Sequence, residues 1–187
     1  MLKKIIVPLS FLVFLISNLL FSQANPVNFS SKINYPVRAG EVVEIEILAS
    51  MEDEWKIYSV HKKTEGPLPT EISISANIVG SIGPTFEPEP NYAFDPGFES
   101  ETYYHSGRTK FSLFFRLKKD LKPGIYPLDI EIYYMVCNER LCYPPKLISS
   151  VVNVEIQDGS TRAGRTSFPT IDNLSKNNSN QTDNSLL

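Results

Sequence analysis

The chain has 187 residues, which is enough for one domain with extensions at its ends. Its formal net charge is −3. This mildly acidic balance argues against a nucleic-acid partner, because phosphate binding needs a surface rich in Lys and Arg.

The first 24 residues are typical of a signal peptide. Lys3 and Lys4 give a positively charged start, residues 5–21 are mostly apolar, and Ala24 ends a Ser-Gln-Ala sequence that suits signal peptidase. No cysteine lies near this cleavage site, so lipid attachment there is excluded. We therefore expect an exported chain in an oxidising compartment, where two cysteines are normally paired.

Residues 25–157 are predicted to form one all-β domain. Apolar and polar residues alternate in short segments, Pro and Gly separate these segments, and no long segment has apolar residues at helical spacing. Such a pattern indicates a sandwich of two antiparallel sheets. In chain order, the predicted strands cover residues 27–33, 43–47, 55–60, 70–76, 111–117, 128–136 and 152–156.

Residues 83–107 form the longest stretch without a strand pattern. They include four prolines and six aromatic residues. Long loops in compact domains often serve as lids or binding loops, and this many aromatic side chains need a surface on which to pack. We expect an irregular loop that covers a functional site.

Residues 158–187 are predicted to be a polar, disordered tail. They are rich in Ser, Thr, Asn, Asp and Gln and show no apolar periodicity. Such a segment buries too little apolar surface to offset the entropy lost on ordering.

The only two cysteines, Cys137 and Cys142, flank a predicted four-residue turn. Residues that flank such a turn lie opposite each other, at a distance that a disulfide can span. Pro144 and Pro145 follow and lack backbone N–H groups, so this part of the chain is expected at a sheet edge, where solvent can reach the pair.

Three interpretations of the pair remain open on this pattern: a structural staple, a metal site and a redox couple. The loop is short, so a staple would contribute only about 2 kcal/mol. A zinc site needs three or four ligands, and the two histidines, His61 and His105, are far apart in sequence and are expected on the surface. The sequence thus predicts no metal and no cofactor, and it has no motif for hydrolytic catalysis.

Several segments resemble the N-terminal periplasmic domain of the thiol:disulfide interchange protein DsbD family, in a stand-alone version. The turn in this chain is one residue shorter than in the best-known members of that family. The resembling segments are residues 133–137, 142–145, 55–59, 66–70 and 95–104.

The resemblance implies an immunoglobulin-like sandwich whose cysteines carry reducing equivalents, in the periplasm and in processes such as cytochrome c biogenesis. Cys142 would be the attacking thiol and Cys137 its partner. An aromatic residue of the cap loop would shield them, with Phe98 the first choice and Phe94 the second.

The same resemblance places Tyr58 beside the cysteines and Asp95 in the cap loop, where an acidic side chain near a thiol would raise its pKa. It implies a membrane-embedded electron donor and periplasmic thioredoxin-like or disulfide-isomerase clients. The alternative is an envelope binding or adaptor module in which the hairpin disulfide is only structural.

Overall fold

The structure is a computed structural model that describes residues 25–61 and 66–170. The predicted signal peptide and the last part of the predicted tail, residues 171–187, lie outside the described residues. Strands dominate, and one turn of 3₁₀ helix, η2 (Ala163–Arg165), follows the last strand. Within these two ranges, no helix is long and apolar enough to cross a membrane.

The first sheet contains four antiparallel strands in the order β1-β3-β9-β6. The alternation predicted around Val43 and Ile47 is confirmed, because both side chains are fully buried on the inner face of the sheet. The strands are β1 (Val27–Lys32), β3 (Val42–Met51), β9 (Arg108–Leu117) and β6 (Val79–Phe86).

The second sheet has the order β2-β12-β10-β5. It is antiparallel except for the short pairing of β2 with β12, which is parallel. Its inward side chains, such as Leu128 and Ile130, are fully buried together with Phe111 and Phe115 of the first sheet. The strands are β2 (Val37–Arg38), β12 (Lys146–Gln157), β10 (Gly124–Tyr134) and β5 (Glu71–Ser75).

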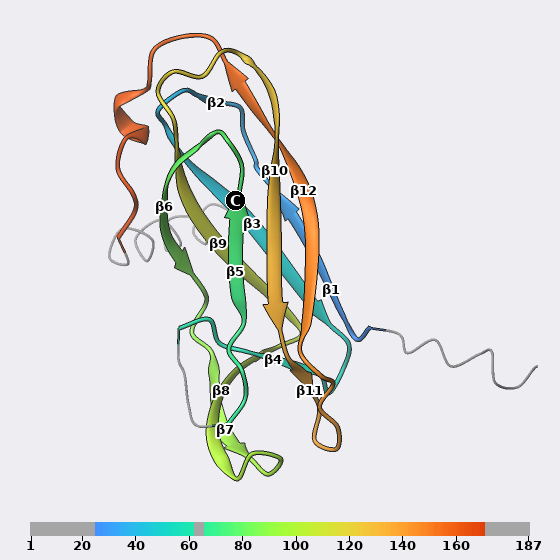
Figure 1. The fold of residues 1–187 in the computed structure, drawn as a ribbon. Coiled ribbons are helices and arrows are strands. Elements are labelled where there is room, and N and C mark those ends of the chain that lie inside the picture. Colours follow the sequence, from blue (N-terminus) through green and yellow to red (C-terminus); the bar gives the residue numbers. More distant parts are fainter. Residues whose placement is uncertain (1–24, 62–65, 171–187) are drawn as a thin grey trace, which may run out of the picture.

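These two sheets enclose the hydrophobic core, and the predicted all-β, immunoglobulin-like sandwich is confirmed (Figure 1). Burial of the alternating aliphatic and aromatic side chains provides the main driving force for folding. The predicted strand 128–136 is shifted along the chain, because β10 begins at Gly124 and ends at Tyr134, and residues 136–137 pair with a different sheet.

A third, smaller sheet lies at one end of the sandwich, with the order β11-β4-β8-β7 (Figure 1). This sheet combines β11, which directly follows β10, with β7 and β8, which come from the aromatic-rich stretch before β9. The strands are β11 (Val136–Cys137), β4 (Lys56–Tyr58), β8 (Ser100–Ser106) and β7 (Asn91–Asp95).

The prediction that residues 83–107 are irregular was wrong. The segment contains the end of β6 and an antiparallel hairpin of β7 and β8, which we call the cap hairpin (residues 91–106). Tyr92 and Tyr103 lie opposite each other across it, with ring centroids 4.6 Å apart. Pro84 lies in β6 at a register shift between Ile82 and Thr85, whereas the other three prolines lie before the hairpin and in its turn. At such positions a proline does not interrupt a regular ladder.

Residues 158–170, which the sequence assigned to the tail, start at the end of the sandwich away from β11 and then run back beside β6 (Figure 1). The Arg162 guanidinium donates to both carboxylate oxygens of the fully buried Glu41, at 2.7 and 2.6 Å. Phe168 lies against Gly83, where a β-carbon would come within 2.3 Å of its ring. An ion pair and an aromatic contact thus hold this part of the chain in place.

Candidate functional site

Cys137 and Cys142 form a disulfide in the third sheet, with Cα atoms 4.1 Å apart. Cys137 lies in β11, an edge strand that pairs with β4 on one side, and the two cysteines form an isolated antiparallel bridge on the other. Cys137 is fully buried, whereas Cys142 is half-buried. The Cys142 end is therefore the more accessible end of the bond.

Asn138 organises the turn between the cysteines. Its backbone N–H donates to the Leu141 carbonyl at 2.9 Å, and its Oδ1 accepts from the backbone N–H groups of Arg140 and Leu141 at 2.9 and 2.8 Å. Such side-chain to backbone bonds are the reason why Asn is favoured in turns. The local sequence therefore fixes the geometry that brings the two sulfur atoms together.

An aromatic stack holds the chain directly after Cys142. Tyr143 lies almost parallel to Trp55, with ring centroids 5.1 Å apart and an interplanar angle of 13°. Its backbone N–H donates to the Val136 carbonyl at 3.0 Å, and the ammonium group of Lys146 lies 5.4 Å from its ring centroid. Trp55 directly precedes β4, and β4 also pairs with Cys137. Cys137 and the residue after Cys142 are therefore both held against the same segment.

The cap hairpin is joined to β4 by a buried polar cluster. The Tyr58 hydroxyl donates to Asp95 Oδ2 at 3.1 Å, and the Lys56 ammonium lies 2.8 Å from the same oxygen. Burial and the charge of Asp95 raise the pKa of Tyr58, so its hydroxyl stays protonated. Burial disfavours the charged form of Asp95, but hydrogen bonds from Lys56, the Gly97 N–H and Tyr58 outweigh it and lower the pKa of Asp95.

The two predicted shielding residues lie in different environments. The Phe98 ring meets the Tyr58 ring edge-on, with centroids 6.0 Å apart, and a β-carbon on Gly66 would come within 3.0 Å of Phe98 Cβ. Phe94 lies in β7 and is 58% exposed. Phe98 is thus packed against a residue of the strand next to the disulfide, whereas Phe94 is largely exposed to solvent.

A second buried polar cluster was missed by sequence reasoning. His105, expected on the surface, is 3% exposed, and its Nε2 lies 2.9 Å from Glu87 Oε2. The Ser59 hydroxyl donates to the other carboxylate oxygen. Glu87 lies 28 positions after Ser59 and 18 positions before His105, so no local motif joins these residues. His61 lies on the surface as expected.

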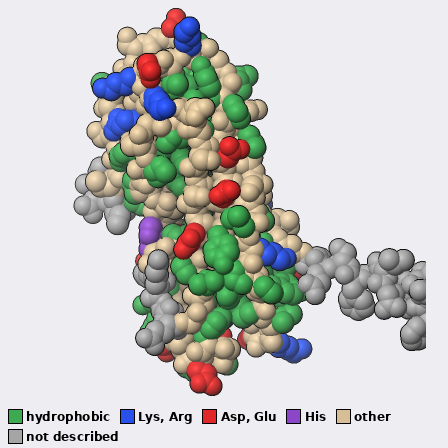
Figure 2. Space-filling view, viewed as in Figure 1, with side chains coloured by type: hydrophobic (Ala, Val, Ile, Leu, Met, Phe, Trp, Pro, Cys, Tyr) green, Lys and Arg blue, Asp and Glu red, His purple; other side chains and the backbone are tan. Residues whose placement is uncertain are grey.

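Hydrophobic side chains gather on the end of the molecule that carries the disulfide (Figure 2). Leu141, in the turn between the cysteines, is 49% exposed, and Leu147, at the start of β12, is 59% exposed. Leu68, in the segment before β5, is 41% exposed. Among the residues that the structure describes, no group of three or more His, Cys, Asp or Glu side chains is arranged to hold a metal ion. The site therefore consists of a disulfide, aromatic side chains and buried ion pairs.

Comparisons with known proteins show the family of the chain and relatives of its fold. Residues 23–152 match the family model of the N-terminal domain of the thiol:disulfide interchange protein DsbD. The N-terminal periplasmic domain of ScsB from Proteus mirabilis has a similar fold, with a TM-score of 0.51 and 14% identity over 72% of this chain and 48% of that chain. This chain therefore spans about half of the ScsB structure that it matches.

The reduced N-terminal domain of DsbD from Neisseria meningitidis gives a TM-score of 0.41 and 17% identity over 69% of this chain and 90% of that domain. No curated protein sequence matches the chain significantly. The family match covers well over half of the sequence and includes both cysteines. The chain belongs to the family of the N-terminal domain of the thiol:disulfide interchange protein DsbD.

Proposed function

We propose that the Cys137/Cys142 pair passes reducing equivalents to disulfide-bonded proteins of the bacterial periplasm. The observation that carries the proposal is the position of the pair in an edge hairpin, with Cys142 accessible and Cys137 buried beside it. Thiol–disulfide exchange needs one sulfur that a client can reach and a second sulfur close enough to release it. The family match supports this chemistry.

In the proposed reaction, the reduced protein begins with two thiols. The Cys142 thiolate attacks one sulfur of a client disulfide, a mixed disulfide forms, and the other client sulfur leaves as a thiolate that takes up a proton. The Cys137 thiol then loses its proton and attacks the Cys142 sulfur, which releases the second client thiol. The client gains two electrons, and this chain is left with the Cys137–Cys142 disulfide that the structure contains.

The proposed partners follow from this balance. A second protein must restore the two thiols, and we propose a membrane-embedded donor for this step. The clients would be thioredoxin-like proteins or disulfide isomerases. Leu141, in the turn between the cysteines, is 49% exposed and would give such partners an apolar contact beside the disulfide. The signal peptide predicted for residues 1–24 would deliver the chain to the periplasm.

The aromatic and acidic residues of the cap hairpin would control access. We propose that Phe98 shields the pair from stray oxidants and that Tyr58 and Asp95 hold the hairpin in its closed position. Their ring contact and hydrogen bond support this role. Since Lys56 pairs with Asp95, the negative charge of Asp95 is largely offset, and we expect Asp95 to raise the thiol pKa of the reduced pair less than an unpaired carboxylate would.

The experiment that tests this function traps the mixed disulfide. Cys137→Ala leaves Cys142 with no partner that can release the client, so covalent adducts should accumulate in the cell envelope. Cys142→Ala is the matched control and should trap far less, because the buried Cys137 is poorly accessible. Absence of any Cys142-dependent adduct would refute the proposal.

The alternative function is that of a binding module with a structural disulfide, and the full burial of Cys137 favours it. The bond closes a short loop with a sequence separation of 5, so its loss should cost about 2 kcal/mol. Replacing both cysteines by Ala distinguishes the two functions. A large fall in melting temperature with unchanged partner binding would favour the binding module.

A further inference from the structure

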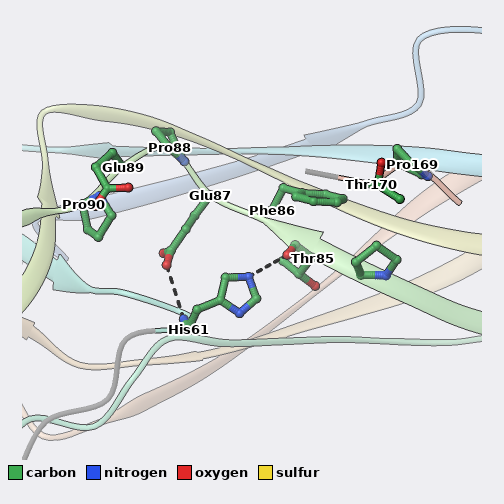
Figure 3. A pocket seen from close by; sticks show the side chains of 10 residues that line it. His61, Thr85, Phe86, Glu87, Pro88, Glu89, Pro90, Pro169 and Thr170 are labelled. Carbon is green, nitrogen blue, oxygen red and sulfur yellow. Dashed lines mark hydrogen bonds between the residues drawn. The ribbon is translucent and has the colours of Figure 1, made fainter. Parts of the chain in front are cut away.

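The connection between β6 and β7 carries a buried carboxylate that the redox chemistry does not use. Glu87 lies one residue after β6, and its side chain is 5% exposed. Glu87 borders a cavity of about 510 Å³, and its carboxylate points toward the backbone of His61 (Figure 3). Its role is therefore to be sought in the strands that it joins.

Four groups surround the Glu87 carboxylate. Oε2 lies 2.9 Å from His105 Nε2 and accepts from the Val60 backbone N–H at 2.9 Å. Oε1 accepts from the Ser59 hydroxyl and, at 3.3 Å, from the His61 backbone N–H (Figure 3). Burial disfavours the charged form, but the hydrogen bonds from His105, Ser59 and Val60 outweigh it and lower the pKa of Glu87 to about 2. The carboxylate is thus fully satisfied and ionised.

These contacts join the cap hairpin to the strand next to the disulfide. Ser59 directly follows Tyr58 at the end of β4, and His105 lies in β8, opposite Ile57 of β4. The same β4 pairs Lys56 with Cys137. Glu87 therefore ties the base of the cap hairpin to β4, while the Tyr58–Asp95 bond ties its far end to the same strand.

We propose that Glu87 is a positioning residue for the redox site: it holds the base of the cap hairpin on β4, and so keeps Phe98 over Tyr58 and limits access to the disulfide. Backbone pairing of β8 with β4 also holds the base of the hairpin, and Glu87 adds a side-chain link to that ladder. Without this link the hairpin opens more often, because local opening depends on the contacts that join it to its neighbours. The inference rests on the proposed shielding role of the cap hairpin.

A second buried carboxylate provides a matched control. Glu41 is fully buried and also has its pKa lowered to about 2, since hydrogen bonds from Arg162 and the Arg38 N–H outweigh the cost of its burial. It lies beside the start of β3, at the level of Leu117, far along β9 from the residues that contact the cap hairpin. Glu41→Gln therefore weakens a comparable cluster without touching the redox site.

The test measures how fast dithiothreitol reduces the disulfide in the intact chain. The reductant becomes a cyclic disulfide, and Cys137 and Cys142 each become thiols. Glu87→Gln, which retains the size of the side chain but removes its charge, should accelerate reduction roughly tenfold, the effect of losing one charge-assisted hydrogen bond. Glu41→Gln should change the rate less than about twofold, even where both variants melt at lower temperatures.

A double variant separates positioning from general destabilisation. In a Phe98→Ala background, Glu87→Gln should give no further acceleration, because both changes remove the same barrier. Equal rates for Glu87→Gln and the unchanged protein, equal acceleration by Glu41→Gln, or additive effects with Phe98→Ala would each overturn the inference. If Glu87→Gln fails to fold, Ser59→Ala removes one of the four contacts and should give a smaller acceleration with the same dependence on Phe98.

The outcome is independent of the trapping experiment, because dithiothreitol replaces the biological partner. Acceleration by Glu87→Gln without any envelope adduct of Cys142 would remove the proposed function and retain the positioning role. Envelope adducts of Cys142 without acceleration by Glu87→Gln would retain the proposed function and remove the positioning role.

Discussion

At the scale of single residues, the site depends on a buried ion pair that differs from an ordinary surface pair. The side chains of Lys56 and Asp95 are 15% and 6% exposed, and they lie 2.8 Å apart. Lys32 and Glu46 pair at 3.2 Å, but the Lys32 side chain is 67% exposed. Removal of one partner from a buried pair leaves a charge without compensation, whereas water compensates at the surface.

We therefore predict that Lys56→Met lowers the free energy of unfolding by about 3 kcal/mol. Lys32→Met is the control and should cost less than about 1 kcal/mol. Urea unfolding at pH 7 measures both values. Equal losses in the two variants would show that the Lys56–Asp95 pair contributes no more than a surface pair.

At the scale of elements, the cap hairpin rests on a close backbone approach. Gly66 has a φ of +137°, and a β-carbon there would come within 3.0 Å of Phe98 Cβ and of Ser100 Oγ. Gly107, at the other end of the hairpin, has a φ of +64°, but a β-carbon added there would have no atom within 4 Å. Only the first glycine therefore combines a left-handed backbone with contact to the proposed shield.

Gly66→Ala is predicted to lower stability by more than about 1 kcal/mol and to accelerate reduction of the disulfide, because the added methyl group displaces Phe98. Gly107→Ala should cost a similar backbone strain of about 1 kcal/mol and leave the rate unchanged. Thermal melts and dithiothreitol reduction kinetics on both variants check the prediction. Acceleration by Gly107→Ala as well would mean that strain alone opens the site.

The large strands could be predicted from the sequence, but the cap hairpin could not. In β3 and β10, aliphatic residues alternate with polar ones because one face lies on an apolar core. In β7 and β8 the buried residues are instead Asp95, Thr102 and His105, so no hydrophobic alternation marks these strands. The aromatic side chains of residues 83–107 indicated that this stretch packs on the rest of the domain. They did not indicate that it forms a hairpin.

The part of the candidate site that is formed by residues close together in the sequence was predictable. The spacing of the cysteines around a turn indicated a disulfide, because residues flanking a short turn face each other. The preference for Phe98 over Phe94 as the shielding residue rests on the family resemblance alone. The Glu87 cluster depends on three segments that meet only after folding, and single-sequence patterns contain no signal for such a contact.

At the scale of the whole molecule, two buried carboxylates couple stability to pH. Glu41 and Glu87 lie toward opposite ends of the first sheet, and the pKa of each is lowered from 4.5 to about 2. A carboxylate with a lowered pKa stabilises the folded state above its unfolded pKa, and this contribution is lost as the pH falls through the folded value. Each group thus contributes roughly 3 kcal/mol at neutral pH.

We predict that the free energy of unfolding is nearly constant above about pH 5.5 and falls steeply between pH 4.5 and 2. Glu41→Gln should lower stability at pH 7 and reduce this slope by nearly one proton, or about 1.4 kcal/mol per pH unit. Urea titrations at a series of pH values measure the slope. An unchanged slope in Glu41→Gln would show that Glu41 has an ordinary pKa in the folded protein.

A disulfide that exchanges with other proteins differs from one that staples the fold in its reduction potential. Equilibration of the intact chain with dithiothreitol redox buffers gives the value. We predict a potential above about −270 mV, within the range of thiol–disulfide exchange proteins. A potential below about −300 mV, typical of structural disulfides in secreted proteins, would show that the pair is a structural staple.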